Sequence, residues 1–225
     1  MRKQRSDGQE TRQNLLTAAG EIFARKGFRA ATIAEICRQA KANTASISYH
    51  FGSKEALYVE SWRYAFSQSL TAYPLDGGIP PEAPAEERLR GRILAIMRRI
   101  IDPKSHEFDI FHKELANPTG LLVNAMQESV EPIFKGLTLL IGELLAQKPE
   151  EHEVRLCAMS IRAQCFGPLL HARRRKTAQG IPICDLEPLL EDVEQLADHV
   201  TRFSLAGIQA LRPQHSQQSD NKVYP

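Results

Sequence analysis

The stretch ANTASISYHFGSKEALY, residues 42–58, decides the fold of this chain. Its centre predicts a short helix in which Ile47 and Phe51 form an inward-facing apolar pair among small hydroxyl residues, a tyrosine and a histidine. An isolated helix this short is marginally stable in water. It also lacks the broad apolar stripe of a helix that packs on its own core. We therefore expect its polar side chains to meet a partner outside the protein.

Two helices are expected before this stretch. The first spans roughly residues 9–26, with a capping box at Asp7–Glu10 before it and Gly27 after it. The second is short and opens at another capping box, Thr32–Glu35. After a tight turn at Lys41-Ala42, Asn43 is expected to cap the short helix, and Ser53 to cap a longer helix that follows it. Two short helices joined in this way and braced by a preceding helix form a helix-turn-helix unit.

A helix-turn-helix unit places its second helix in the major groove of DNA, with the N-terminal residues against base edges. Small side chains let the backbone approach, and hydroxyls bond to several bases. The residues expected to face bases are Thr44, Ala45 and Ser48. Those expected to hold phosphates are Thr32, Ser46, Tyr49, His50 and Lys54. The N-terminal Arg2, Lys3 and Arg5 are expected to form a disordered arm that reaches the DNA.

Charge is distributed unevenly along the chain. Residues 1–54 contain ten Lys/Arg and four Asp/Glu, which gives +6, whereas the other 171 residues contain 19 and 23, which gives −4. A basic first quarter is the asymmetry expected if one end binds a polyanion. The alternative is a solvated surface with no such role.

Beyond residue 70 the chain again favours helices. Residues 71–87 contain four prolines and two adjacent glycines, and they predict a loop. Five further helices are expected, at about 86–101, 105–116, 117–147, 150–176 and 185–211. The expected domains are residues 1–55 for DNA binding, residues 56–212 for ligand binding and dimerisation, and residues 213–225 as a disordered tail.

Large and polarisable side chains are spread over the helices of the second domain. Together they could line an apolar cavity with a few polar groups, which is the usual composition of a small-molecule site. Taken singly, each is equally well explained as ordinary core. The candidates are Trp62, Phe66, Met97, Phe108, Phe111, His112, Met126, Phe134, Phe166 and His171.

The last two predicted helices are long and amphipathic. Such a pair at the end of a chain suits a two-fold interface in which four helices pack together. We therefore expect a homodimer through these helices.

The remaining composition excludes several classes of protein. The four cysteines form no C-x-x-C pair and have no zinc-like histidine spacing, so free thiols are expected and neither a metal nor a cofactor. No apolar region follows the basic N-terminus, and no run approaches a membrane span, so we expect a cytoplasmic protein without membrane contact. No G-x-S-x-G, G-x-G-x-x-G, P-loop or H-E-x-x-H motif indicates an enzyme.

Residues 32–58, TIAEICRQAKANTASISYHFGSKEALY, closely resemble the N-terminal signature of the TetR family of bacterial regulators. The resemblance covers roughly residues 10–60, and the YHF-x-SKEAL portion is quite specific. Residues 111–145 are similar to the effector domain of the CecR-like branch. Two positions depart from the pattern: Lys41 stands where many members have glycine, and Ala34 where some have a base-reading arginine.

The resemblance implies an all-α protein of about nine helices. Helices 1–3 would bind a near-palindromic operator in double-stranded DNA, helices 4–7 would enclose the pocket of an unknown small-molecule effector, and helices 8 and 9 would form the homodimer. The function expected is that of a repressor that releases its operator when the small molecule binds. The alternative is a regulator that responds to a protein partner or to oxidation of a thiol.

Overall fold

The computed structural model describes residues 2–177 and 192–212. Over these residues the chain forms nine helices and no strand, as expected for an all-α protein. Their bounds are α1 Arg2–Ala30, α2 Ile33–Ala40, α3 Ala45–His50, α4 Lys54–Ala72, α5 Ala85–Ile101, α6 His106–Ala116, α7 Val123–Leu145, α8 His152–Thr177 and α10 Val193–Leu211. The predicted tail, residues 213–225, and the predicted helical residues 185–191 lie outside the described residues.

The first helix differs from its prediction at the start and agrees at the end. It begins at Arg2, so the capping box at Asp7 and the disordered arm are wrong. Inside the helix, the Asp7 carbonyl oxygen accepts a bond of 2.8 Å from the Thr11 hydroxyl. The basic and amide residues before it favour helix, which explains the longer helix. At Gly27 the backbone kinks, with φ 76° and ψ 172°, a conformation readily available only to glycine.

Local capping signals position α2 and α4 as predicted. The Thr32 hydroxyl oxygen accepts a bond of 3.2 Å from the Glu35 amide, and the Ser53 hydroxyl oxygen accepts one of 3.1 Å from the Ala56 amide. Each bond satisfies one of the free amides that begin a helix.

The start of α7 was predicted wrongly. Residues 117–122 form a turn instead of a helical start at Asn117, and α7 begins at Val123. The Glu114 carboxylate accepts bonds from the amides of Thr119 at 2.8 Å and Gly120 at 3.0 Å. A side chain of α6 therefore captures the amides of this segment.

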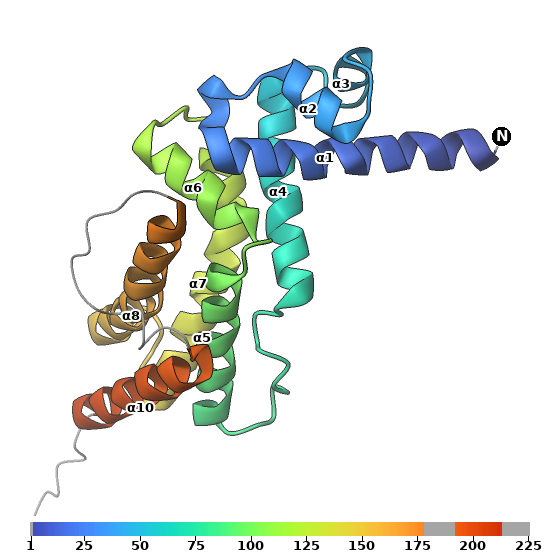
Figure 1. Ribbon diagram of the computed structural model, residues 1–225. Helices are drawn as coiled ribbons and strands as arrows, with labels where there is room; N and C mark the ends of the chain where they lie inside the picture. Colours follow the sequence, from blue (N-terminus) through green and yellow to red (C-terminus); the bar gives the residue numbers. More distant parts are fainter. Residues whose placement is uncertain (1, 178–191, 213–225) are drawn as a thin grey trace, which may run out of the picture.

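Two apolar cores hold the helices together. The first joins α1–α4 and extends to Ile110 of α6 and to Leu122 and Ala125 at the start of α7. The second joins α5, α7, α8 and α10, with Phe108 of α6. Because the first core includes residues of α6, the N-terminal helices pack directly on the second half of the chain. Figure 1 shows α1–α3 gathered at one end of the molecule and α10 at the other.

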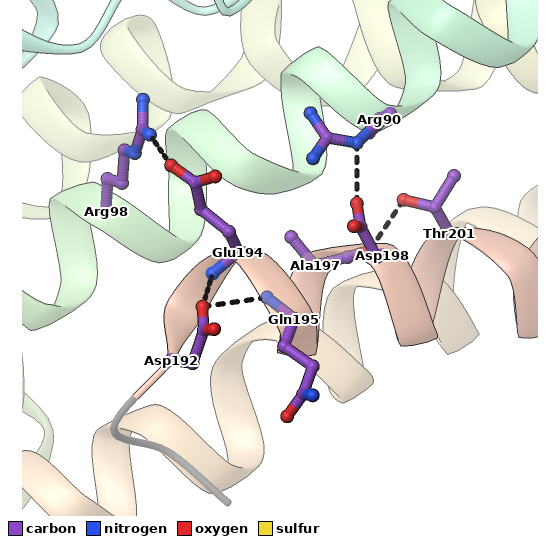
Figure 2. Close-up of polar contacts among 8 residues, drawn as sticks. All are labelled: Arg90, Arg98, Asp192, Glu194, Gln195, Ala197, Asp198 and Thr201. Atoms are coloured by element: carbon purple, nitrogen blue, oxygen red, sulfur yellow. Dashed lines mark hydrogen bonds and ion pairs between the residues drawn. The ribbon is translucent and has the colours of Figure 1, made fainter.

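Ion pairs fix α10 along α5, as Figure 2 shows. Arg90 contacts Asp198 at 2.6 Å, and Arg98 contacts Glu194 at 2.5 Å. The Asp192 carboxylate caps α10 by accepting bonds of 3.0 Å from the backbone amides of Glu194 and Gln195. The start of α10 is thus defined by its own cap and by its contact with α5.

Candidate nucleic-acid interface and ligand cavity

The short helix α3 presents a polar face to solvent. Ile47 is buried in the first core and Phe51 is half-buried against it. Tyr49 is 84% exposed. The other side chains predicted to touch DNA from this helix are exposed at Thr44, Ala45 and Ser48 and half-buried at Ser46 and His50. The helix therefore has the one-sided burial that its sequence predicts, while the contacts of each residue with DNA stay predictions.

The turn before α3 is closed by backbone bonds. Lys41 has φ 53° and ψ 40°, the left-handed conformation that a glycine would adopt more easily. The Lys41 amide donates to the Arg38 carbonyl at 3.3 Å, and the Ala42 amide donates to the Cys37 carbonyl at 2.9 Å. The Asn43 side chain then accepts a bond of 3.0 Å from the Ala45 amide, which supports its predicted capping role.

The cations of the N-terminal helices differ in their availability. Lys26 is paired with Glu35, and this hydrogen bond lowers the pKa of the Glu35 carboxyl. The Lys54 ammonium lies 4.5 Å from the ring centre of Phe28, so an aromatic face holds it at the start of α4. Arg38 and Lys41 at the end of α2 are exposed. These two exposed cations are not among the residues predicted to contact DNA, although the +6 charge count includes them.

A cavity of about 690 Å³ lies among α4, α5, α6, α7 and α8. Its volume is within the range of small-molecule sites. Most of the predicted candidates lie on its wall, namely Trp62, Phe66, Phe108, Phe111, Met126, Phe134 and Phe166.

Two candidates, Met97 and His112, are not among the described residues of this cavity wall. Met97 is fully buried in the second core, because it shares a face of α5 with Ile93 and Ile100. His112 follows Phe111 on α6, and the wall includes Phe111 but not His112. The side chain of His171 lies outside the described residues. Met97 and His112 thus have no support from this cavity, and their role in ligand binding stays a prediction.

Charged residues of the wall were missed from the sequence. Arg99 and Glu107 are each 3% exposed, and the Arg99 guanidinium donates to the Glu107 carboxylate at 2.7 and 3.1 Å. The same guanidinium lies 5.1 Å from the ring centre of Phe66 and 5.8 Å from that of Phe108. The helical spacing of the sequence could have indicated the two arginines of this wall. Ile96 lines the cavity, and Arg92 and Arg99, four residues before it and three after it, share its face of α5.

A buried carboxylate connects the cavity helices with the N-terminal helices. Glu114 of α6 accepts a bond of 3.0 Å from the hydroxyl of Tyr58 in α4, besides its bonds to the turn at Thr119 and Gly120. Burial and the nearby carboxylate raise the pKa of Tyr58, so its hydroxyl remains a donor. We name this group, Tyr58 with Glu114, Thr119 and Gly120, the Glu114 hub.

Two sequence models of protein families match the chain. Residues 85–208, more than half of the chain, match the C-terminal domain of the HTH-type transcriptional dual regulator CecR. Residues 15–60 match the tetR family of bacterial regulatory proteins. The chain belongs to the TetR family, with a CecR-type C-terminal domain. This TetR-family protein is therefore related to transcriptional regulators and not to enzymes.

Curated relatives of this TetR-family protein are regulators. The HTH-type transcriptional repressor NicS of Pseudomonas putida strain KT2440 is 36% identical over 86 residues, which cover 37% of this chain and 40% of NicS. The HTH-type transcriptional regulator SrpR of Pseudomonas putida is 28% identical over 147 residues, which cover 65% of this chain and 66% of SrpR. The matches thus span less than two thirds of either relative.

Solved structures share the fold. A transcriptional regulator from Rhodococcus sp. Rha1 has a TM-score of 0.65 at 15% identity, covering 88% of this TetR-family chain and 96% of its own. The fatty acid degradation regulator FadR from Bacillus halodurans has a TM-score of 0.65 at 15% identity, covering 87% and 98%. At such identity the likeness concerns the fold alone. No helix among the described residues has the length and apolar character needed to cross a bilayer.

Proposed function

We propose that this protein is a repressor that binds a near-palindromic operator as a homodimer and releases it when a small molecule fills the cavity. The observation that best supports DNA binding is the exposed polar face of α3. Ile47 is the one buried side chain of this helix and anchors it to the first core. A helix of six residues without an apolar stripe contributes little to its own core. Its polar face matches what the major groove accepts.

The test of this function is binding to the DNA upstream of the protein's own gene. Fluorescence anisotropy with a labelled duplex is expected to give sequence-preferring binding that weakens steeply with salt, because several phosphates are neutralised. A scrambled duplex of equal length is the control. Equal affinity for both duplexes at every salt concentration would contradict the proposal.

The dimer interface proposed is the outer face of α8 and α10. Large apolar side chains stay exposed there, and Phe203 is 63% exposed. The others are Leu156, Met159 and Leu211. A Cβ placed on Gly167 of α8 or on Gly207 of α10 would meet no atom within 4 Å, so both faces have room for a close helix. A second copy would cover these faces and form the expected four-helix contact.

The Glu114 hub offers a route from the cavity to α3. Phe108 and Phe111 of α6 line the cavity, while Glu114 on the same helix holds Tyr58 of α4. Helix α4 begins shortly after α3, and α6 also packs on α1. Just beyond α6, the Pro118 carbonyl accepts a bond of 3.5 Å from the Arg29 guanidinium of α1. A ligand that favours another position of α6 would thereby change the separation of the two α3 helices and lower operator affinity.

The alternative signal, oxidation of a thiol, has less support. Burial raises the pKa of Cys37, Cys157 and Cys165, that of Cys165 to about 12. Because the thiolate is the reactive form, such thiols are poor redox sensors. Cys184 lies outside the described residues.

A further inference from the structure

The charged side chains on the cavity wall do not balance one another. The cations are Arg92, Arg99, Lys135 and Arg162, and the acids are Glu107 and Glu131. Arg99 and Glu107 neutralise each other across 2.7 Å. Three cations then remain on the wall with one carboxylate, that of Glu131; Arg92 and Arg162 are half-buried, and Lys135 and Glu131 are exposed. Within residues 2–177 and 192–212, none of these three cations forms an ion pair.

Arg92 and Arg162 reach α7 from two other helices, whereas Lys135 belongs to α7 itself. A Cβ placed on Gly136 would lie 3.1 Å from Nη1 of Arg92, which extends from α5. The guanidinium carbon of Arg162, which extends from α8, lies 4.1 Å from the ring centre of Phe134. Lys135 stands between these two contact points. The three cations of the cavity wall thus lie on or beside residues 134–136 of α7, which we name the cationic turn.

The partial burial of Arg92 costs free energy. Burial lowers the pKa of Arg92; the charge of Asp76 opposes this effect and that of Arg88 adds to it. A partly buried cation that forms no ion pair is destabilising, and an incoming anion reduces that penalty. Guanidinium groups bind carboxylates and phosphates through two parallel hydrogen bonds.

The surroundings of the cationic turn separate into an apolar and a polar space. Away from the turn, Trp62, Phe66 and Phe108 make the large cavity predominantly apolar. A smaller cavity of about 200 Å³ adjoins it, because both share Phe134, Leu137, Thr138 and Arg162. The smaller cavity adds a second arginine, Arg155. A ligand with an apolar body and a charged end would find both environments within one site.

We propose that the large cavity binds an amphipathic organic anion. Its apolar body, aliphatic or aromatic, fills the space beside Trp62, and its carboxylate or phosphate-like head lies among Arg92, Lys135 and Arg162. This inference rests on the proposed function, to which it adds the chemical class of the effector.

The single tryptophan of the chain makes the test direct. Trp62 lies on the cavity wall and is 3% exposed, so its fluorescence reports occupancy of this cavity. The full-length protein is titrated with laurate, dodecan-1-ol, dodecyltrimethylammonium and 2-naphthoate, the two charged surfactants below their critical micelle concentrations and the others below their solubility limits. Laurate is expected to bind about tenfold or more tightly than the alcohol or the cation of equal chain length, since a charged hydrogen bond contributes that much. Saturable binding of 2-naphthoate would extend the site to aromatic bodies.

Matched variants separate recognition of the head from packing. Arg92→Gln and Arg162→Gln are each expected to weaken laurate about tenfold and to leave dodecan-1-ol unchanged. Lys148 is exposed and lines neither of the two cavities. Lys148→Gln therefore removes the same charge elsewhere and should leave the affinities for laurate and for dodecan-1-ol unchanged. Unchanged alcohol binding also shows that the arginine variants are folded.

Three outcomes would overturn the inference: equal binding of laurate and alcohol, preference for the cation, or no saturable response to either carboxylate. Equal loss of both ligands in the arginine variants would assign these residues to packing and overturn it as well. Operator binding by the same samples keeps the two proposals apart. A protein that binds its operator and fails the amphiphile test remains a regulator without this ligand class, whereas laurate binding without operator release supports the ligand class and contradicts its effector role.

Discussion

At the scale of single residues, Lys54 and Ser48 are expected to affect DNA binding differently. Lys54→Met keeps the aliphatic stem over Phe28 and removes the charge, so it should weaken binding to all sequences and reduce the salt slope by about 1. Ser48→Ala should change the preference at one base position by about 1 kcal/mol, because a single hydroxyl bond is lost. Anisotropy against a set of single-base variants of the operator measures both effects. Equal losses on every sequence would refute the role of Ser48, and Lys148→Met serves as the neutral control.

Cys165 provides a residue-scale prediction about pH. Its thiol has an ordinary pKa of 9.0, which burial raises to about 12 in the folded protein. Below pH 9 the thiol is protonated in both the folded and the unfolded chain, so the contribution of the buried thiol to the free energy of unfolding is fully present there. Above it the unfolded chain loses the proton first, and the free energy of unfolding falls by up to about 1.4 kcal/mol per pH unit until the folded pKa is reached.

Urea denaturation of the wild type and of Cys165→Ala, at about pH 8 and about pH 10.5, measures this contribution, and the other titrating groups cancel between the two proteins. The variant is less stable at the lower pH because it leaves a cavity. The difference in the free energy of unfolding between the wild type and the variant is expected to be smaller at the higher pH. An equal difference at both pH values would show that the Cys165 thiol has the same pKa in the folded and the unfolded protein.

At the scale of elements, the Glu114 hub is expected to couple α6 to α4. Tyr58→Phe removes one buried hydrogen bond, so it should lower the free energy of unfolding by about 1 kcal/mol and reduce the effect of a bound ligand on operator affinity. Tyr64→Phe on the same helix is the matched control, because it removes a bond to Gln13 at the surface. Anisotropy with and without ligand measures the coupling. An undiminished ligand effect in Tyr58→Phe would exclude the hub from the route.

Elements that depend on local signals could be predicted from the sequence, and those that depend on distant partners could not. Thr32 and Ser53 cap helices through amides three residues away, so the pattern contains the whole interaction. The start of α7 was missed because Glu114 of another helix captures the amides that Asn117 was expected to cap. Likewise Arg99 is buried only because Glu107 meets it, and a periodicity of apolar residues does not contain that pairing.

At the scale of the whole molecule, operator binding is expected to require the dimer. Two α3 helices about one DNA turn apart bind together, so the second contact forms at high effective concentration. Phe203→Glu places a charge in the middle of the proposed α8–α10 interface, where desolvation opposes pairing of the subunits. The variant should sediment as a monomer and bind the operator about 100-fold more weakly or worse.

Leu139→Glu makes the matched comparison, since Leu139 is 51% exposed on α7 and lies outside the proposed interface. It introduces the same charge on an exposed apolar position, so it should remain dimeric and bind the operator as the wild type does. Sedimentation velocity at several protein concentrations gives the assembly state, and anisotropy gives the affinity. A dimeric Phe203→Glu protein would locate the two-fold contact elsewhere. A monomeric variant with undiminished affinity would mean that one α3 helix is enough for recognition, and the near-palindromic operator would lose its physical basis.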